Sequence, residues 1–490
     1  MDRQSLHLGA WRPLDGSKGG PFRLPAHHLV THGVVVGATG SGKTGLLMVL
    51  VEEALREQIP VLVIDVKGDL PNLLLSFPTL APSELLPWAS AAASANDARA
   101  HAAIAAELAE ERRRGLAAWS IGELELAAFR ASTSVRVITP GASAGELLHV
   151  LSSLERRSDR WEHDPESARA ALSAAISLVL RLLGRDPDPA KSREHVLLSV
   201  LAERRLLAGE SADIGVLLED LARPPITRIG ALELEAFFPK RSRRDLAASL
   251  NTLLASPTFT SWRQGTTLDV GAWLTPQGGR TPAVVVSVAH LDDDERALVL
   301  GVLLEEVVTW VRSLPGSQRL RALIVFDEVY GFLPPHPANP PTKRPLVALM
   351  KQARAFGVGV VVATQNPMDL DYRALGNAGL WCLGRLQVDA DRARVLDGLA
   401  LGDTGRDDAN ELALTLQRLA PRWFVTRDAH ASEGAVLMQP RWAMSFMRGP
   451  MTRAEIRMAL GHHRSTNLEP ERESTGATNG QSQVRHPAQS

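Results

Sequence analysis

The eight residues from Gly37 to Thr44, GATGSGKT, match the pattern G-x-x-x-x-G-K-[ST] in full. Glycines at these positions let backbone N–H groups curl around phosphate oxygens without a Cβ in the way. A strand pattern precedes the segment and a helix pattern follows it, so the dipole of the helix N-terminus would point at the same anions. The pattern therefore predicts a phosphate-binding loop that comprises Gly37, Ala38, Thr39, Gly40, Ser41, Gly42, Lys43 and Thr44.

Two side chains of this loop have separate expected roles. Lys43 would contact the β- and γ-phosphates of a nucleoside triphosphate, and the Thr44 hydroxyl would be a ligand of Mg²⁺. We therefore expect ATP and Mg²⁺ as the cofactors.

Such a loop needs one acid near the metal and another near the attacking water, and two segments compete for these roles. ALIVFDE at 322–328 ends in the adjacent acids Asp327 and Glu328, whereas VLVIDVKGD at 61–69 offers Asp65. Adjacent acids at the carboxyl end of a strand suit both roles, because ligands bind at that edge of an open α/β sheet. We favour Asp327 as the metal ligand and Glu328 as the catalytic acid. A solvated turn after a buried strand is the alternative for this pair.

Three further polar residues are candidates for catalysis. Gln365 ends the strand pattern GVGVVVATQ, where its amide could contact the γ-phosphate or the attacking water; a helix or turn cap is the alternative. Arg354, just before that strand, is a candidate arginine finger for the nucleotide of a neighbouring subunit, and Arg385 is a second candidate. Either arginine could instead be an ordinary surface or salt-bridge residue.

Alternating strand and helix patterns would position these residues. A strong helix pattern at 292–313 follows one predicted strand and precedes another, and such alternation favours a largely parallel α/β sheet. Strands are predicted at 33–36, 60–65, 135–141, 282–291, 322–328, 357–365 and 380–386.

Composition and breaks divide the chain into five parts. Helical patterns with Pro-rich breaks interrupt the core, and the C-terminal end is polar and nearly free of large apolar side chains. We expect an irregular lead-in at 1–30, a first part of the core at 31–155 with a helical excursion at 82–130, a helical insertion at 156–275, a second part of the core at 276–460, and a disordered tail at 461–490.

The bulk composition is that of a globular protein. The chain has 490 residues and a net charge of −1, which gives no global bias towards nucleic acid or membranes. A single cysteine, Cys382, excludes an intrachain disulfide and fits a reducing cytosol. The sequence has neither an N-terminal apolar segment of signal-peptide length nor a run of about 18 apolar residues, so we expect a cytoplasmic protein without a membrane segment of its own.

With these segments in hand, the chain resembles the HerA/FtsK superfamily of hexameric DNA-pumping ATPases, and most closely bacterial HerA-like ATP-binding proteins. RWAMSFMRGPMT at 441–452 also looks like the C-terminal end of such proteins. The other matching pieces lie in order from 32 to about 400: HGVVVGATGSGKT, VIDVKGDL, FDEVYGFLPP, ARAFGVGVVVATQNP and GRLQVDADRARVLDGL.

The resemblance implies a RecA-like P-loop core, a ring of six subunits and an ATP site between neighbours. It implies Walker A roles for Lys43 and Thr44, Walker B roles for Asp327 and Glu328, and a sensor role for Gln365. It identifies VIDVKGD as the second-strand motif of the family, in which the roles of Asp65 and Lys67 stay open.

The chain also departs from the named members of the superfamily. HerA begins with a small β-barrel that about 30 residues cannot form, and FtsK carries membrane helices and a DNA-reading winged helix that this sequence lacks. The large helical insertion is more similar to those of conjugation and secretion ATPases. These departures weaken the expectation of a DNA partner more than they weaken the expectation of ATPase activity.

A DNA-translocating ring would hold phosphates with basic residues that face its pore. The candidates are PKRSRR at 239–244, ERRRG at 111–115, and the Pro-rich loop at 332–346 with Lys343 and Arg344. The alternatives are solvated helix ends for the clusters and a rigid connector for the loop. The 14 histidines are scattered and predict no metal-nuclease site, so a nuclease would be a partner protein.

Three functions stay open at this point. The first is a hexameric motor that translocates duplex DNA together with a nuclease or other effector. The second is a conjugation- or secretion-type ATPase that acts on a protein or nucleoprotein substrate and needs a membrane partner. The third is a nucleotide-dependent scaffold or switch with slow hydrolysis.

Overall fold

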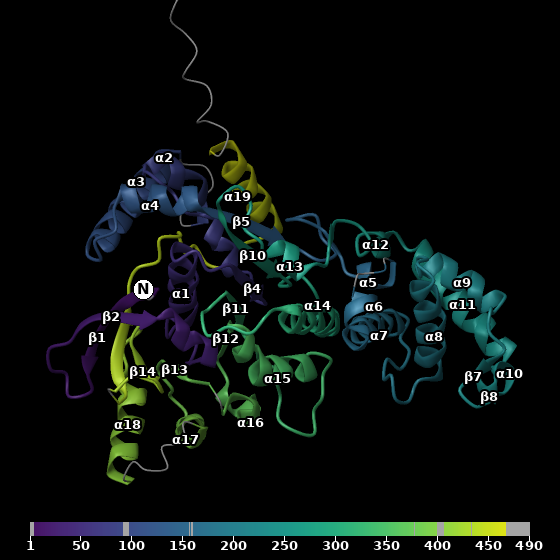
Figure 1. The fold of residues 1–490 in the computed structure, drawn as a ribbon. Helices are drawn as coiled ribbons and strands as arrows, with labels where there is room; N and C mark the ends of the chain where they lie inside the picture. The colour runs from purple at the N-terminus through teal and green to yellow at the C-terminus, as the bar shows by residue number, and fades with distance from the viewer. Residues whose placement is uncertain are drawn as a thin grey trace, which may run out of the picture.

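One large sheet forms the centre of the protein (Figure 1). The computed structural model describes residues 4–91, 98–155, 157, 160–376, 378–398, 406–432 and 434–466. Within them, eleven strands hydrogen-bond side by side. In spatial order they are β2 (Gly20–Pro25), β1 (Ser5–Pro13), β15 (Val436–Pro440), β14 (Phe424–Asp428), β13 (Leu380–Leu383), β3 (Gly33–Val36), β12 (Val358–Thr364), β11 (Ala322–Asp327), β4 (Val61–Asp65), β10 (Thr281–Ser287) and β5 (Thr133–Ile138).

The predicted strands form the parallel part of this sheet. From β13 to β5 every neighbouring pair is parallel, and these are the seven strands predicted from the sequence. The prediction of a largely parallel α/β fold is confirmed. The other four strands continue the sheet in antiparallel fashion beyond β13.

The prediction of an irregular lead-in at 1–30 is wrong. Its residues form β1 and β2, which pair as a hairpin, followed by the 3₁₀ helix η1 (Ala26–Thr31). A register shift between His7 and Gly9 interrupts the two-residue alternation, and the inner partner of β1, towards the centre of the sheet, is β15 from the other end of the chain. A local reading of the sequence detects neither feature.

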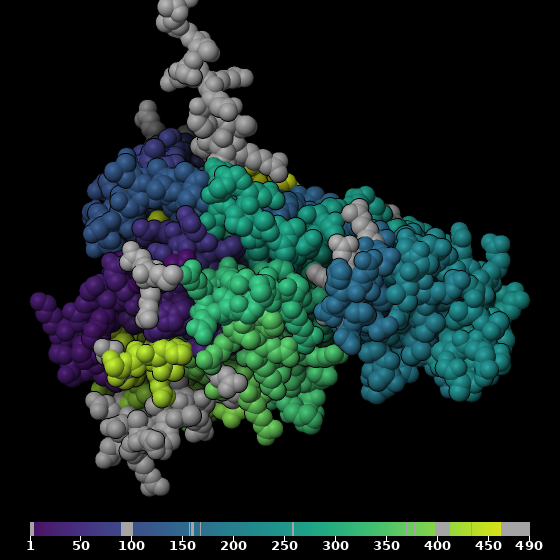
Figure 2. All heavy atoms as spheres, viewed as in Figure 1, coloured from purple at the N-terminus to yellow at the C-terminus, as the bar shows by residue number. Residues whose placement is uncertain are grey.

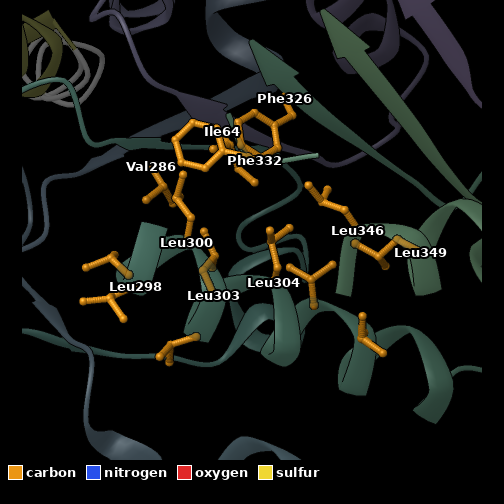
Figure 3. Close-up of a cluster of buried hydrophobic side chains, with 14 of the residues drawn as sticks. Ile64, Val286, Leu298, Leu300, Leu303, Leu304, Phe326, Phe332, Leu346 and Leu349 are labelled. Carbon is orange, nitrogen blue, oxygen red and sulfur yellow. The ribbon is translucent and has the colours of Figure 1, made fainter. Parts of the chain in front are cut away.

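The central strands are buried on both faces, as parallel strands covered by helices usually are. Along β4, Leu62 and Ile64 pack in one apolar cluster and Val61 and Val63 in the other. Figure 3 shows Ile64, with residues of β10 and β11, packed with leucines of α14 (Asp293–Ser313) and α15 (Lys343–Gln352). The opposite face carries α1 (Lys43–Arg56), which contributes to the second cluster.

The helical insertion projects from the body as a lobe at the right of Figures 1 and 2. Its helix α7 packs against α14, so its apolar residues are continuous with one core cluster. The helices of the lobe are α5 (Ser152–Glu155), α6 (Arg160–His163), α7 (Pro165–Leu182), α8 (Arg193–Leu207), α9 (Ile214–Ala222), α10 (Leu234–Phe237), α11 (Lys240–Ala255) and α12 (Pro257–Thr260), and β7 (Arg228–Ile229) pairs there with β8 (Leu232–Glu233). After the lobe the chain returns to the body with α13 (Val270–Trp273), which contacts α14 (Figure 1). The short strands β6 (Leu148–His149) and β9 (Thr266–Thr267) on either side of these helices pair with each other.

Smaller helices complete the body. Those after β4 are η2 (Leu70–Leu74), which precedes the segment 82–130, and then α2 (Pro82–Leu85), η3 (Leu86–Ala91), α3 (Ala98–Ala117) and α4 (Glu123–Ser132). Those around β12 and β13 are η4 (Ala353–Phe356), η5 (Pro367–Asp369), α16 (Tyr372–Leu375), α17 (Asp389–Gly398) and α18 (Arg406–Arg418). In the part of the chain that the structure describes, no helix combines the length and apolar character needed to span a bilayer.

The start of the predicted disordered tail is helical. Helix α19 (Arg453–Thr466) runs past residue 461, and its buried residues Ile456 and Ala459 attach it to the body. The expectation for 461–466 is therefore wrong, and residues 467–490 lie outside the described residues.

A buried ion cluster joins α1 to the segment that follows β15. The guanidinium of Arg441, which has no exposed surface on its side chain, pairs with Glu52 and Glu53 at 2.9 Å each. Glu52 also accepts hydrogen bonds from the backbone N–H groups of Met444 and Ser445. The helix that follows the glycine-rich loop is thus held in place by residues almost 400 positions later in the sequence.

Candidate functional site

The glycine-rich loop lies between β3 and α1, as predicted. Gly40 and Gly42 have φ angles of 75° and 97°, a region that L side chains rarely adopt. A Cβ on Gly42 would also lie 3.1 Å from the Cα of Arg422, and one on Gly37 would lie 2.6 Å from the Ser41 hydroxyl. Gly40 and Gly42 are therefore required by their backbone conformation, and Gly37 by its close approach to the Ser41 side chain.

Lys43 folds back over its own loop. Its Nζ donates hydrogen bonds to the carbonyl of Gly37 at 2.6 Å and to that of Ala38 at 3.4 Å. Burial lowers the pKa of the Lys43 amine to about 8, while the nearby carboxylate of Glu328 acts in the opposite direction. This buried cation lies where a phosphate-binding loop needs one. Thr44 follows it in the first turn of α1.

Asp327 ends β11 with an unusual carboxylate. Both of its oxygens are buried and, within the described residues, neither has a hydrogen-bond partner. Burial raises the pKa of Asp327 to about 7, and the neighbouring acids Glu328 and Asp65 raise it further. Unpartnered buried acceptors are costly, and a carboxylate is a preferred ligand of Mg²⁺. The residues present therefore fit a magnesium ion at this position.

Glu328 is held by donors from the segments that follow two other strands, β4 and β12. Its Oε1 accepts hydrogen bonds from Lys67 Nζ at 2.7 Å and from Gln365 Nε2 at 2.6 Å. The other end of the Gln365 amide accepts a hydrogen bond from the Thr39 hydroxyl of the loop. Glu328 itself has a φ of 56°, a conformation that is rare outside glycine and often found at functional sites. A continuous chain of contacts thus runs Thr39–Gln365–Glu328–Lys67.

Asp65 has a different environment from Asp327, although the two residues pair directly across β4 and β11. Its Oδ1 accepts hydrogen bonds from the N–H groups of Gly68 and Asp69, and its Oδ2 accepts one from the Ser287 hydroxyl at 2.7 Å. These contacts are those of a side chain that caps the turn after β4. The preference for Asp327 over Asp65 as a metal ligand stays a prediction, which the unpartnered oxygens of Asp327 support.

Sequence reasoning left the role of Lys67 open. Its ion pair with Glu328 follows from the order of the strands, because β4 and β11 are neighbours and their carboxyl ends lie together. The signal in the sequence was the lysine two positions after an aspartate that ends a strand. Only knowledge of the strand order could have joined it to Glu328.

The two arginine candidates lie in different places. Arg385 is half-buried, and its carbonyl accepts a hydrogen bond from the Ala38 N–H of the loop, so its backbone lies against the loop of its own subunit. Arg354 is exposed and precedes β12, which puts it a full strand length, about 23 Å, from the edge that carries the loop. The structure does not bring Arg354 to its own site.

Two of the basic clusters have structural contacts. Arg112 is buried and donates to the carbonyls of Ala443 and Met444, while Arg243 is buried and donates to Phe238. In the Pro-rich loop, Lys343 pairs with an aspartate of the neighbouring segment. These three basic side chains serve the fold, whereas Lys240, Arg241 and Arg244 of one cluster, Arg113 and Arg114 of the other, and Arg344 of the loop are exposed and stay candidates for a surface contact.

Comparison with known proteins supports the resemblance. The family described as Helicase HerA-like C-terminal matches residues 12–76, which include the loop and the Asp65–Lys67 motif. No curated protein matches the sequence significantly. The resemblance to the HerA/FtsK superfamily, inferred from the motifs, is confirmed over this stretch.

Two solved structures share the fold along nearly the whole chain. VirB4 of Thermoanaerobacter pseudethanolicus aligns with a TM-score of 0.50 and 14% identity over 90% of this chain and 97% of that chain. The bacterial conjugative coupling protein TrwBdeltaN70 aligns with a TM-score of 0.50 and 14% identity over 93% and 92%. The predicted RecA-like P-loop fold is confirmed.

Proposed function

We propose that this chain binds ATP together with Mg²⁺ and hydrolyses it. The observation that carries the proposal is the pair of adjacent acids beside the loop, one with buried unpartnered oxygens and one held by two donors. A metal ligand and a water-polarising base need these two different environments. The HerA-like match over the loop gives independent support.

Each residue has a defined task in this proposal. The loop N–H groups and Lys43 would hold the phosphates, with Lys43 exchanging the Gly37 carbonyl for phosphate oxygens. Thr44 and Asp327 would hold Mg²⁺, whose charge would neutralise the phosphate oxygens. Glu328 would accept a hydrogen bond from the attacking water, and Gln365 would position both groups.

Matched substitutions at the paired aspartates test the metal assignment. Asp327→Asn is expected to lower Mg²⁺-dependent ATP turnover at least about 100-fold, because it removes the anionic ligand. Its melting temperature should not fall, since a buried charge without a partner is removed. Phosphate release across a Mg²⁺ titration and thermal unfolding measure the two effects.

Asp65→Asn is the control for that experiment. An amide can still accept from the Gly68 N–H and donate to the Ser287 hydroxyl, so turnover should stay within a few-fold of the wild-type value. If Asp65→Asn abolishes hydrolysis and Asp327→Asn does not, the metal assignment is wrong.

We further propose that the ATPase is a homohexameric motor in which Arg354 is the finger that reaches the nucleotide of the next subunit. The support is its exposed position at the sheet edge opposite the loop, which suits action on a neighbour and excludes action on its own site. Arg385 is the second candidate, but its backbone already lies against the loop of its own subunit.

The proposed substrate is duplex DNA, with a nuclease or other effector protein as partner. The HerA-like match supports this proposal, whereas the structural roles of Arg112 and Arg243 reduce the basic surface available for it. A conjugation-type ATPase that acts on a protein or nucleoprotein is the second candidate. The likeness to VirB4 and TrwBdeltaN70 over more than four fifths of the chain favours that candidate.

ATP hydrolysis by the purified chain, with and without linear duplex DNA at low salt, separates these functions. A DNA motor should hydrolyse ATP at least about tenfold faster with DNA, and the stimulation should fade as salt rises because phosphate contacts are screened. The Glu328→Gln variant gives the background rate of phosphate release in this assay. Hydrolysis that is indifferent to DNA at every salt concentration would contradict the DNA substrate and leave the protein-substrate motor or the switch.

A further inference from the structure

Lys67 has one charged partner, and that partner is the expected catalytic acid. Its ammonium lies 2.7 Å from Glu328 Oε1, and within the described residues this is its only ion pair. The exposed fraction of the side chain is 39% for Lys67 and 10% for Glu328, so the lysine is the more exposed member. An ion pair with so exposed a member adds little to the stability of a fold, which makes a role in the site the stronger explanation for it.

Two donors reach the same oxygen of Glu328 from the two flanking strands. β11 lies between β4 and β12 in the sheet, and Lys67 and Gln365 follow these two neighbours. Both donate to Oε1, whereas Oε2 accepts no hydrogen bond from the described residues. A carboxylate that is held through one oxygen from both sides has little freedom to rotate, and its second oxygen can accept a hydrogen bond from water.

The turn that carries Lys67 is fixed on both sides of the lysine. Before it, the Asp65 carboxylate accepts hydrogen bonds from the N–H groups of Gly68 and Asp69. After it, Gly68 has a φ of 91°, and its carbonyl accepts a hydrogen bond from the Met451 N–H at 2.8 Å. The side chain of Lys67 therefore starts from a defined backbone position, which the C-terminal segment helps to set.

We propose that Lys67 is a positioning residue for hydrolysis: it holds the Glu328 carboxylate in the orientation in which Oε2 accepts a hydrogen bond from the attacking water. The inference rests on the proposed ATP hydrolysis and gives the VIDVKGD motif a task in it. A base must lie within hydrogen-bond distance of the proton that it accepts, and a displacement of about 1 Å can cost about 100-fold in rate. Lys67 itself contacts neither the water nor the phosphates in this role.

A direct contact with phosphate is the competing role for Lys67. Burial is the main cause of the lowered pKa of Lys43, and the Lys67 ammonium lowers it further, so the two cations lie in the same region. The ion pair with Glu328 favours the positioning role, because the charge of Lys67 is already compensated there. The two roles change different quantities: a phosphate contact contributes to ATP affinity, whereas a positioning residue contributes to turnover.

Lys67→Met tests the proposal, because it keeps an unbranched apolar side chain and removes the ammonium. Turnover is expected to fall about 10- to 100-fold, while ATP affinity stays within about threefold of the wild-type value. Steady-state phosphate release measures turnover, and calorimetric titration with ATP and Mg²⁺ measures affinity. Lys67→Arg keeps a charged donor and should recover turnover to within about fivefold of the wild-type value.

A double variant shows whether Lys67 acts through Glu328. The Glu328→Gln background has no carboxylate to position, so adding Lys67→Met should change the remaining turnover less than about twofold. A lysine that only supports the fold would lower turnover by the same factor in both backgrounds. Lys191→Met is the matched control, because Lys191 pairs with Asp188 on the helical insertion, and it should change neither turnover nor affinity.

The outcomes separate this inference from the function on which it rests. If the wild type hydrolyses ATP and Lys67→Met has an equal or higher turnover, the positioning role is wrong and the ATPase proposal stands. Lost ATP affinity with normal turnover at saturating ATP would assign Lys67 to the phosphates instead. If the wild type hydrolyses no ATP with Mg²⁺, the ATPase proposal is refuted and the role of Lys67 with it. Thermal unfolding checks each variant, and Lys67→Ala replaces Lys67→Met if the latter fails to fold.

Discussion

Glu328→Gln is expected to lower ATP turnover at least about 100-fold and to leave ATP affinity unchanged, since a positioned general base contributes about 10²–10⁴-fold to a rate. The amide oxygen of glutamine can still accept the hydrogen bonds from Lys67 and Gln365. The variant therefore keeps the contact chain to Thr39 and removes only the negative charge that would polarise water.

Two measurements test this prediction. Steady-state phosphate release measures turnover, and calorimetric titration with ATP and Mg²⁺ measures affinity. Glu203→Gln is a matched control, because Glu203 pairs with Arg169 on the helical insertion, away from the loop. Turnover by Glu328→Gln close to that of the wild type would show that another group activates the water.

Lys43→Ala is expected to weaken ATP binding at least about 100-fold. Lys43 is the cation of the loop itself, and a pKa of about 8 leaves its amine mostly protonated at neutral pH. Its contacts are to the carbonyls of Gly37 and Ala38, so its removal deletes charge for the phosphates without breaking a buried ion pair.

The readout is the same calorimetric titration, together with thermal unfolding to show that the variant is folded. Lys351→Ala is the control, because Lys351 is an exposed lysine near the end of α15. Affinity within about threefold of the wild-type value would refute the assignment of residues 37–44 as the phosphate site. We expect normal ATP binding for Glu328→Gln and lost ATP binding for Lys43→Ala. This difference tests whether the loop binds the phosphates while Glu328 acts only in hydrolysis.

The sequence alone was sufficient to predict the strands that are buried on both faces. Runs such as VLVID and ALIVFD have few polar residues, and helix patterns lie between them, so the existence and direction of β4 and β11 follow from local pattern. The loop and the candidates Asp327, Glu328 and Gln365 were found in the same way. The contacts Thr39–Gln365–Glu328 then place these residues together.

Features that depend on distant pairing could not be predicted. β1 pairs on its inner side with β15, more than 400 residues later, and no local pattern specifies that pairing. The partner of Lys67 depends on strand order, and Arg112 and Arg243 have the sequence signature of solvated cations although they are buried. For β1, Lys67 and Arg112 a long-range contact determines the environment. Arg243 instead contacts residues close in sequence, Phe238 and Glu235.

The ion cluster of α1 has a consequence for biosynthesis. Arg441 lies 389 residues after Glu52, so the helix that carries the phosphate loop leaves the ribosome long before its buried cation is made. Burying a carboxylate without its cation is strongly unfavourable, which opposes docking of this helix onto the sheet in the nascent chain. Competence to bind ATP therefore arises late in translation, and a prematurely terminated product without β15 would not retain nucleotide.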